Sequence, residues 1–389
     1  MIAVAWTSLS AAALAVALGC AEPVPVAPRA GAGPLGVRLE LKVSEPQGFS
    51  SLLLPAVDST HVYADLSNGG PVVAIDHRTG ARTWSYARQP LAPSNLVLHD
   101  GTVLFAGAYA VALDARTGAE RWRVEPAKDG PLATAGGLGV SAAAGGVYYF
   151  GTDRWIFALD VATGAERWRL EVGPAWQHPG LVRGVVVSGD TLYASVHRYH
   201  NWNGLYATAH LVAIDRINGV ELWRHVEGDS TGRHIVLLEP RVVGDLLVAA
   251  DHIGNTYFAL DRATGAVRWR VRGTTDGFFG PWEAPTASGD TLFGASADRF
   301  ITAMDLRTGA VHWRSEVGSS ATAAIPCGDR LLVQDQGSYV LDRRTGQILA
   351  RDIHRGEGEY ALLRSRFVLF GGRAYVLGDR ALYAFRCGE

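Results

Sequence analysis

The chain has 389 residues and a formal net charge of −2 at pH 7. This length suits one large domain and requires no second one. Arginine supplies nearly all of the basic charge and is interspersed with acidic residues, so we expect no nucleic-acid partner.

Residues 2–19 form an apolar run that ends in Ala17-Leu18-Gly19-Cys20. We interpret residues 1–19 as a lipoprotein-type signal peptide and Cys20 as the lipidated residue. The signal is atypical, because no basic residue precedes the run and Ala17 stands where such signals usually carry Leu. A conventional cleaved signal peptide and a membrane anchor are the alternatives, although the run is short for a span of about 20 residues.

Lipidation at Cys20 predicts a protein of the cell envelope, held at the outer membrane on its periplasmic face. Without lipidation, the same segment predicts a periplasmic or secreted protein. Residues 20–36 are rich in Pro, Ala and Gly, a composition that builds no core, and we interpret them as a tether.

From residue 37 to residue 389 the chain is repetitive. The motif Ala-x-Asp-x-x-Thr-Gly-x-x-x-Trp runs from Ala74 to Trp84 and recurs along the chain, with Asn218 in the Thr position of one copy and Ala350 in the Trp position of the last. The motif tryptophans are Trp84, Trp122, Trp168, Trp223, Trp269 and Trp313. Copies lie roughly 40–50 residues apart, a period typical of propeller blades.

Each copy predicts a strand, a tight turn and a second strand, and two more short runs upstream complete a four-stranded antiparallel meander. Such a meander cannot bury both of its faces alone, so its neighbours must cover it. We expect each motif tryptophan to dock on the adjoining repeat.

The two ends of the chain each hold part of a further blade. Residues 37–43 form a lone alternating strand, whereas residues 373–377 and 381–386 form two strands that lack a fourth. Pairing of the ends completes an eighth blade and removes an open sheet edge. The sequence therefore predicts an all-β, eight-bladed propeller closed by its two termini, with seven blades as the alternative.

Cys327 and Cys387 form the remaining cysteine pair. In this propeller Cys327 follows the first strand of blade seven and Cys387 follows the third strand of blade eight, so both lie on the same rim of adjacent blades. An exported protein favours a disulfide between them, and two unpaired thiols are the alternative.

The repeat resembles the tryptophan-docking motif of the quinoprotein, or PQQ-like, β-propeller superfamily. The chain is most similar to the BamB family of outer-membrane-protein assembly lipoproteins within it. This resemblance implies a non-catalytic scaffold that binds other envelope proteins, including an outer-membrane assembly barrel protein. A short Leu-Arg-Gly loop leading into Ser-Ala-Pro carries that contact in the family, and the nearest stretch here is Leu181 to Gly184, followed by Val185 to Val187.

The superfamily also contains PQQ-dependent alcohol dehydrogenases, so a PQQ- or other ligand-binding redox propeller is the alternative function. A PQQ enzyme needs a carboxylate base, oxygen ligands for Ca²⁺ and an aromatic floor. Family dehydrogenases also carry adjacent cysteines, which this sequence lacks. The motif aspartates are predicted to cap turns. We therefore expect no catalytic residue, no bound cofactor and no metal.

Three irregular segments carry clustered aromatic and polar residues, and strand alternation places them on the rim opposite the Thr-Gly turns. A rim of this composition favours partner or ligand binding. Rings that plug the funnel mouth are the alternative, and a metal site at His197, His200 and His210 matches no usual ligand spacing. The candidate rim residues are Trp176, His178, Arg183, His197, Tyr199, His200, Trp202, Tyr206, Phe278, Phe279 and Trp282.

Overall fold

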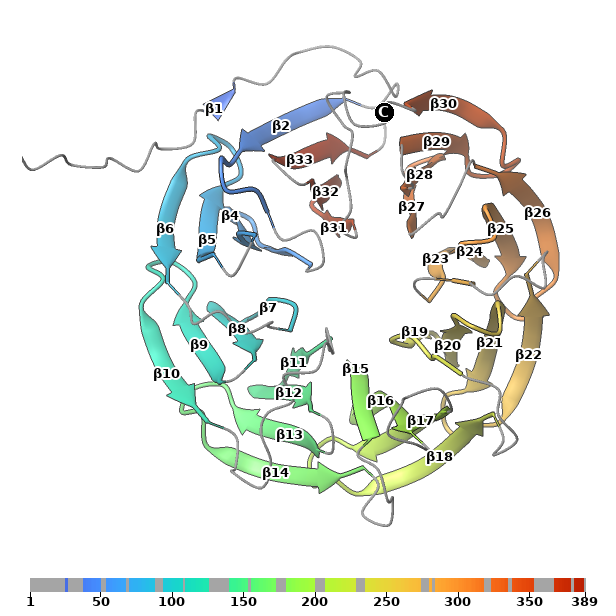
Figure 1. The fold of residues 1–389 in the computed structure, drawn as a ribbon, viewed down its shortest axis with the longest axis horizontal. Helices are drawn as coiled ribbons and strands as arrows, with labels where there is room; N and C mark the ends of the chain where they lie inside the picture. Colours follow the sequence, from blue (N-terminus) through green and yellow to red (C-terminus); the bar gives the residue numbers. More distant parts are fainter. Residues whose placement is uncertain are drawn as a thin grey trace, which may run out of the picture.

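The computed structural model is built of β-strands arranged in a ring (Figure 1). In the described ranges it contains no helix of the length and apolarity that crossing a bilayer requires. The residues that it describes are 25–26, 38–49, 54–67, 70–87, 94–107, 109–125, 140–152, 155–172, 180–199, 207–228, 235–273, 280–281, 284–317, 323–334, 338–352, 367–378 and 381–387.

Eight sheets form the ring, which confirms the predicted eight-bladed propeller (Figure 1). Blade one comprises β3 (Ala56–Val57), β4 (His61–Asp65), β5 (Val72–Asp76) and β6 (Arg82–Tyr86). Blade two comprises β7 (Val97–His99), β8 (Thr102–Ala106), β9 (Ala110–Asp114) and β10 (Glu120–Val124). Blade three comprises β11 (Ala142–Ala144), β12 (Val147–Gly151), β13 (Trp155–Asp160) and β14 (Glu166–Glu171). Blade four comprises β15 (Gly180–Ser188), β16 (Thr191–Tyr199), β17 (Ala207–Asp215) and β18 (Glu221–Glu227).

The second half of the ring repeats this plan. Blade five comprises β19 (Arg241–Val243), β20 (Leu246–Asp251), β21 (Thr256–Asp261) and β22 (Val267–Arg272). Blade six comprises β23 (Thr286–Ser288), β24 (Thr291–Ala295), β25 (Phe300–Asp305) and β26 (Val311–Glu316). Blade seven comprises β27 (Ala323–Cys327), β28 (Arg330–Gln334), β29 (Ser338–Asp342) and β30 (Ile348–Asp352). Blade eight comprises β31 (Val368–Phe370), β32 (Arg373–Leu377), β33 (Ala381–Arg386) and, from the other end of the chain, β2 (Leu39–Ser44).

Within each blade the strands lie side by side in order from the centre of the disc to its outer wall (Figure 1). Because consecutive strands are antiparallel, the turns between first and second strands and between third and fourth strands share one rim, which we call the turn rim. Connections between second and third strands, and from one blade to the next, lie on the opposite rim, which we call the loop rim.

The two ends of the chain close the ring, as predicted. β2 pairs antiparallel with β33, with Leu39 opposite Phe385 and Ser44 opposite Ala381. The carboxylate of Glu40 accepts bonds from Arg373 and Arg386, each at 2.5 Å. Both ends of the chain therefore contribute to the sheet of blade eight.

One part of the predicted tether departs from expectation. Pro25 and Val26 form a two-residue strand, β1, that pairs antiparallel with β2 and adds a fifth strand to blade eight. Proline lacks an N–H donor and is tolerated on an edge strand. The predicted tether thus includes a short strand on the outer edge of the closing blade.

The motif aspartate organises the turn between the third and fourth strands. Asp76 Oδ1 accepts bonds from the N–H groups of Arg78 at 2.9 Å and Thr79 at 2.7 Å. Gly80 follows with φ of 74°, a conformation that glycine adopts without a Cβ clash. The same aspartate bonds recur at Asp114, Asp160, Asp215, Asp261, Asp305 and Asp342.

Each motif tryptophan packs on the turn of the following blade. Trp84 Nε1 donates to the carbonyl oxygen of Ala115 at 2.9 Å, and a Cβ on Gly118 would lie 2.6 Å from Trp84 Cδ2. Glycine is therefore required at position 118 for two reasons: the Trp84 ring leaves no room for a Cβ, and the residue has a positive φ of 71°. Equivalent close approaches bring Gly164 to Trp122, Gly219 to Trp168, Gly265 to Trp223, Gly309 to Trp269 and Gly346 to Trp313.

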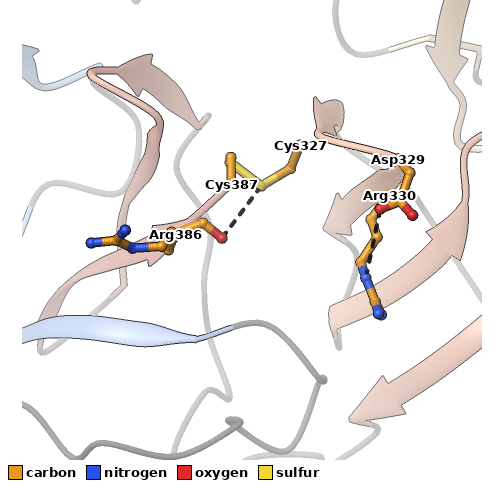
Figure 2. The surroundings of a disulfide bond; sticks show 5 residues. All are labelled: Cys327, Asp329, Arg330, Arg386 and Cys387. Atoms are coloured by element: carbon orange, nitrogen blue, oxygen red, sulfur yellow. Dashed lines mark hydrogen bonds and ion pairs between the residues drawn. A yellow bond between two sulfur atoms is a disulfide. The ribbon is translucent and has the colours of Figure 1, made fainter. Parts of the chain in front are cut away.

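The last motif copy carries Ala350 instead of tryptophan, and a disulfide lies between blades seven and eight. Figure 2 shows Cys327, at the end of β27, bonded to Cys387, which follows β33. Their Cα atoms are 4.6 Å apart. A cluster of buried side chains that includes Ile325, Val340 and Phe385 fills the same interface.

Candidate functional site

The candidate site lies on the loop rim of blade four. Arg183, His197 and Tyr199 belong to described strands of this blade. The other predicted rim residues lie outside the described residues: Trp176, His178, His200, Trp202, Tyr206, Phe278, Phe279 and Trp282. Cys20, the predicted lipidation site, also lies outside them.

Blade four is larger than its neighbours, because β15, β16 and β17 each contain nine residues. His197 and Tyr199, which were predicted to lie in an irregular segment of the rim, are strand residues, so that prediction was wrong. β16 continues through both residues, with His197 opposite Ala209 and Tyr199 opposite Ala207. The pairing persists because β16 lies between β15 and β17, which extend beside it over the same length.

His197 is a core residue that links blades four and five. Its side chain is 1% exposed, and Nε2 lies 3.0 Å from the carbonyl oxygen of Leu237. The neighbouring His210 is also buried, with Nε2 3.2 Å from the hydroxyl of Thr208. Throughout the described ranges, no three His, Cys, Asp or Glu side chains are grouped so that they could hold a metal ion.

β15 lies against the inner parts of both neighbouring blades. The N–H of Val140 in blade three donates to the carbonyl oxygen of Arg183 at 3.2 Å, and the N–H of Val185 donates to Val140 at 2.9 Å. A Cβ on Gly184 would lie 3.1 Å from Cβ of Glu239, which precedes β19. A bulge between Val182 and Gly184 accompanies this close approach.

Arg183 sits at this bulge with an unsatisfied donor. Its side chain is half-buried, and its buried Nε has no hydrogen-bond partner among the described residues. Burial lowers the pKa of His252 in blade five below its ordinary value, and the positive charge of Arg183 lowers it further.

The loop rim of blades five and six forms a bonded polar network. His252 Nδ1 lies 2.8 Å from the carbonyl oxygen of Pro281. Asn255, at φ of 45°, donates to Asp298 Oδ2 and accepts from the hydroxyl of Ser296, both at 3.1 Å. This network was not predicted from the sequence, although Asn and Asp between two apolar strands are a recognisable signal for bonded turns. The polar groups of His252, Asn255 and Asp298 are thus bonded within the rim of blades five and six.

Among the described residues, the loop-rim carboxylates of blades five and six are bonded within the chain and are not grouped as a quinone and Ca²⁺ would require. Asp251 Oδ1 accepts bonds from the N–H groups of Val236 and Ile253, and Asp298 Oδ1 accepts from that of Phe300. The motif aspartates lie on the turn rim, where they cap turns. The described residues therefore do not fit a PQQ–calcium site, and we derive no chemical step through one.

These features define the class of the protein: a β-propeller with tryptophan-docked blades of the quinoprotein type. The family model described as outer membrane protein assembly factor BamB matches residues 106–271 and 207–385. The chain belongs to this family.

Solved structures share the fold. The crystal structure of BamB from Moraxella catarrhalis is 21% identical, with a TM-score of 0.69 over 90% of this chain and 99% of that one. The quinohemoprotein alcohol dehydrogenase from Comamonas testosteroni is 16% identical, with a TM-score of 0.69 over 90% of this chain and 76% of that one. No curated protein sequence matches the chain. At these identities the structural likeness shows the fold alone.

Proposed function

We propose that the protein is a non-catalytic scaffold of the cell envelope that assists outer-membrane protein assembly by binding a partner protein on the loop rim of blade four. Membership of the BamB family supports this role. An outer-membrane assembly barrel protein is the proposed partner. Lipidation at Cys20, after a signal peptide at residues 1–19, would hold the propeller at the periplasmic face of the outer membrane.

The unsatisfied donor of Arg183 is the observation that carries this proposal. Leaving the buried Nε without an acceptor costs about 1–3 kcal/mol, and because this atom is enclosed, a partner's carboxylate or carbonyl oxygen recovers that cost only if the rim beside β15 rearranges on binding. The fixed planar geometry of a guanidinium also orients such an acceptor. A partner that offers an acidic side chain or an exposed main-chain carbonyl beside β15 fits this arrangement.

Crosslinking in the native envelope followed by mass spectrometry tests the proposal. We expect outer-membrane assembly components to be recovered with the wild-type chain and lost with Arg183→Ala. Arg78→Ala is the matched control, because Arg78 is an exposed arginine on the turn rim of blade one, and it should leave recovery unchanged. Consistent absence of assembly components from the wild-type sample would contradict the scaffold role.

A quinone-dependent redox function is the second candidate. The observation that favours it is the equal TM-score, 0.69, with which the Moraxella BamB and the Comamonas dehydrogenase match the fold. The hydrogen bonds that Asp251 and Asp298 accept within the loop rim argue against the redox function. Purified protein supplied with PQQ and Ca²⁺ should show no quinone-dependent dye reduction, and sustained reduction would favour the redox function.

A further inference from the structure

The outer edge of blade eight carries a strand that the other blades lack. In the described ranges blade eight is the one sheet of five strands, because β1 lies on the outer side of β2. Pro25 is opposite Val43, and Val26 is opposite Lys42. The N-terminal part of the chain is therefore attached to the propeller first at β1 and only later at β2.

The direction of β1 determines the rim from which the chain reaches the propeller. β2 is the fourth strand of its blade and runs from the turn rim to the loop rim, where Ser44 is opposite Ala381 at the start of β33. β1 is antiparallel to β2, and Pro25 pairs with Val43, close to the loop-rim end. The chain therefore enters β1 from the loop rim.

β1 also shortens the connection between Cys20 and the propeller. Cys20 lies five residues before Pro25, and an extended chain spans at most about 3.3–3.6 Å per residue, so the two residues lie within about 18 Å of each other. If the attachment began only at Leu39, the same rule would allow a separation of about 65 Å. The pairing of β1 thus confines Cys20 to the surroundings of one edge of the disc.

The charges at this edge are compatible with a lipid surface. Glu40, in β2, is paired with Arg373 and Arg386, and Glu45, which follows β2, is buried and paired with Arg82. The ammonium group of Lys42 lies 5.8 Å from the centre of the Tyr383 ring. Both carboxylates of this strand and the turn after it are therefore compensated within the chain, so they do not repel headgroup phosphates.

We propose that β1 orients the propeller on the membrane by holding the loop-rim edge of blade eight next to the lipid headgroups. This inference rests on the proposed function, because it requires acylation of Cys20. Acyl chains on Cys20 lie in the membrane, and the short connection to Pro25 keeps the nearest edge of the disc within about 18 Å of the acylated residue.

The orientation has a consequence for the partner. Blade four lies across the ring from blade eight (Figure 1). Arg183, on the loop rim of blade four, therefore belongs to the part of the ring farthest from the lipid anchor. A protein with a periplasmic part that projects from the membrane fits this arrangement.

Site-specific photo-crosslinking of the full chain in its native envelope tests the orientation. A photoreactive amino acid replaces Pro46, which is exposed and follows β2 at its loop-rim end. In a matched control it replaces Val226, which is 50% exposed and lies near the loop-rim end of β18, the outer strand of blade four. We expect lipid adducts from position 46 and none from position 226.

Two insertions separate the role of β1 from the length of the tether. A Gly/Ser segment of about twenty residues between Val24 and Pro25 lengthens the connection from Cys20 to β1, so the lipid adducts of position 46 should be lost. The same segment between Ala30 and Gly31 lies beyond β1 and should leave the adducts unchanged. Val26→Pro removes the one main-chain N–H that β1 can donate, so it should reduce the adducts without any insertion.

The outcomes distinguish this inference from the proposed function. Equal effects of the two insertions, or equal reaction of positions 46 and 226, would overturn the orientation. Labelling with a radioactive fatty acid checks the acylation. An unlabelled chain contradicts both the lipid anchor of the proposed function and this inference, whereas a labelled chain with equivalent insertions overturns the orientation alone.

Discussion

Two regions of the ring are held together by different chemistry. From blade one to blade seven, each interface has a motif tryptophan that packs on the glycine between the third and fourth strands of the following blade. The two interfaces of blade eight have none, because Ala350 replaces the ring in blade seven and β2 carries no tryptophan. There the chain uses the Cys327–Cys387 disulfide on one side, and the Glu45–Arg82 ion pair at 2.6 Å on the other.

The difference follows from how each blade is made. A blade built from consecutive residues needs only non-covalent packing against its neighbour, since turns of the chain already connect its strands. Blade eight is assembled from both ends of the chain, so β2 and β33 are neighbours in the sheet without a connecting turn. The clasp of Glu40 with Arg373 and Arg386 holds β2 to that sheet, and the disulfide and the Glu45–Arg82 pair fix blade eight to its two neighbours.

Breaking a docked interface should have the largest effect. Trp122 is buried and donates to the carbonyl oxygen of Val161 at 2.7 Å. Replacing it in Trp122→Ala leaves a cavity against Gly164 and should cost about 3–5 kcal/mol of unfolding free energy. Chemical denaturation measures this. Loss of less than about 1 kcal/mol would contradict the docking role.

Breaking the disulfide should have the next largest effect. Cys327 and Cys387 are 60 residues apart in sequence, and opening such a loop typically costs about 2–4 kcal/mol. Cys327→Ser with Cys387→Ser should therefore lower the unfolding midpoint, and a reducing agent should do the same to wild type. Denaturation of the double variant should be insensitive to the reducing agent, which serves as the internal control.

Weakening the Glu40 clasp should have the smallest effect, and one that depends on pH. Burial alone would raise the pKa of Glu40, but the bonds from Arg386 and Arg373 outweigh it and hold the pKa below its ordinary value of 4.5. This stabilisation is present above pH 4.5 and is lost as pH falls through the lowered pKa. Glu40→Gln should cost about 1 kcal/mol at pH 7.

The pH series distinguishes the clasp from simple packing. The difference in unfolding free energy between wild type and Glu40→Gln should shrink as the pH falls below 4.5. A difference that stays constant down to pH 3 would show that the carboxylate charge contributes nothing to closure.

The repeat made the fold predictable because each motif specifies a whole unit. Asp76, Thr79 and Gly80 determine a turn through bonds within the motif itself. Trp84 determines the contact with the equivalent turn of the next blade, where it donates to Ala115. Closure of the ring was also predictable from the sequence, since residues 37–43 form a strand without a sheet and residues 373–386 form part of a blade without a fourth strand.

Features outside the repeat were harder to predict. The extension of β16 through His197 depends on pairing with β17, and the burial of that histidine depends on Leu237 of another blade. A single blade's pattern contains neither fact. The family resemblance placed Arg183 on the correct blade, but the bulge of β15 beside it and the main-chain bonds to Val140 of blade three involve two blades at once.

The pairing of β2 with β33 also sets the order of events during biosynthesis. Translation produces β2 among the earliest parts of the propeller and β33 at its end, so β2 waits for its partner while every other blade is made. Throughout that interval its exposed edge can associate with strands of other nascent chains. A holdase chaperone that shields the N-terminal strand would therefore raise the yield of closed rings more than one acting on any other segment.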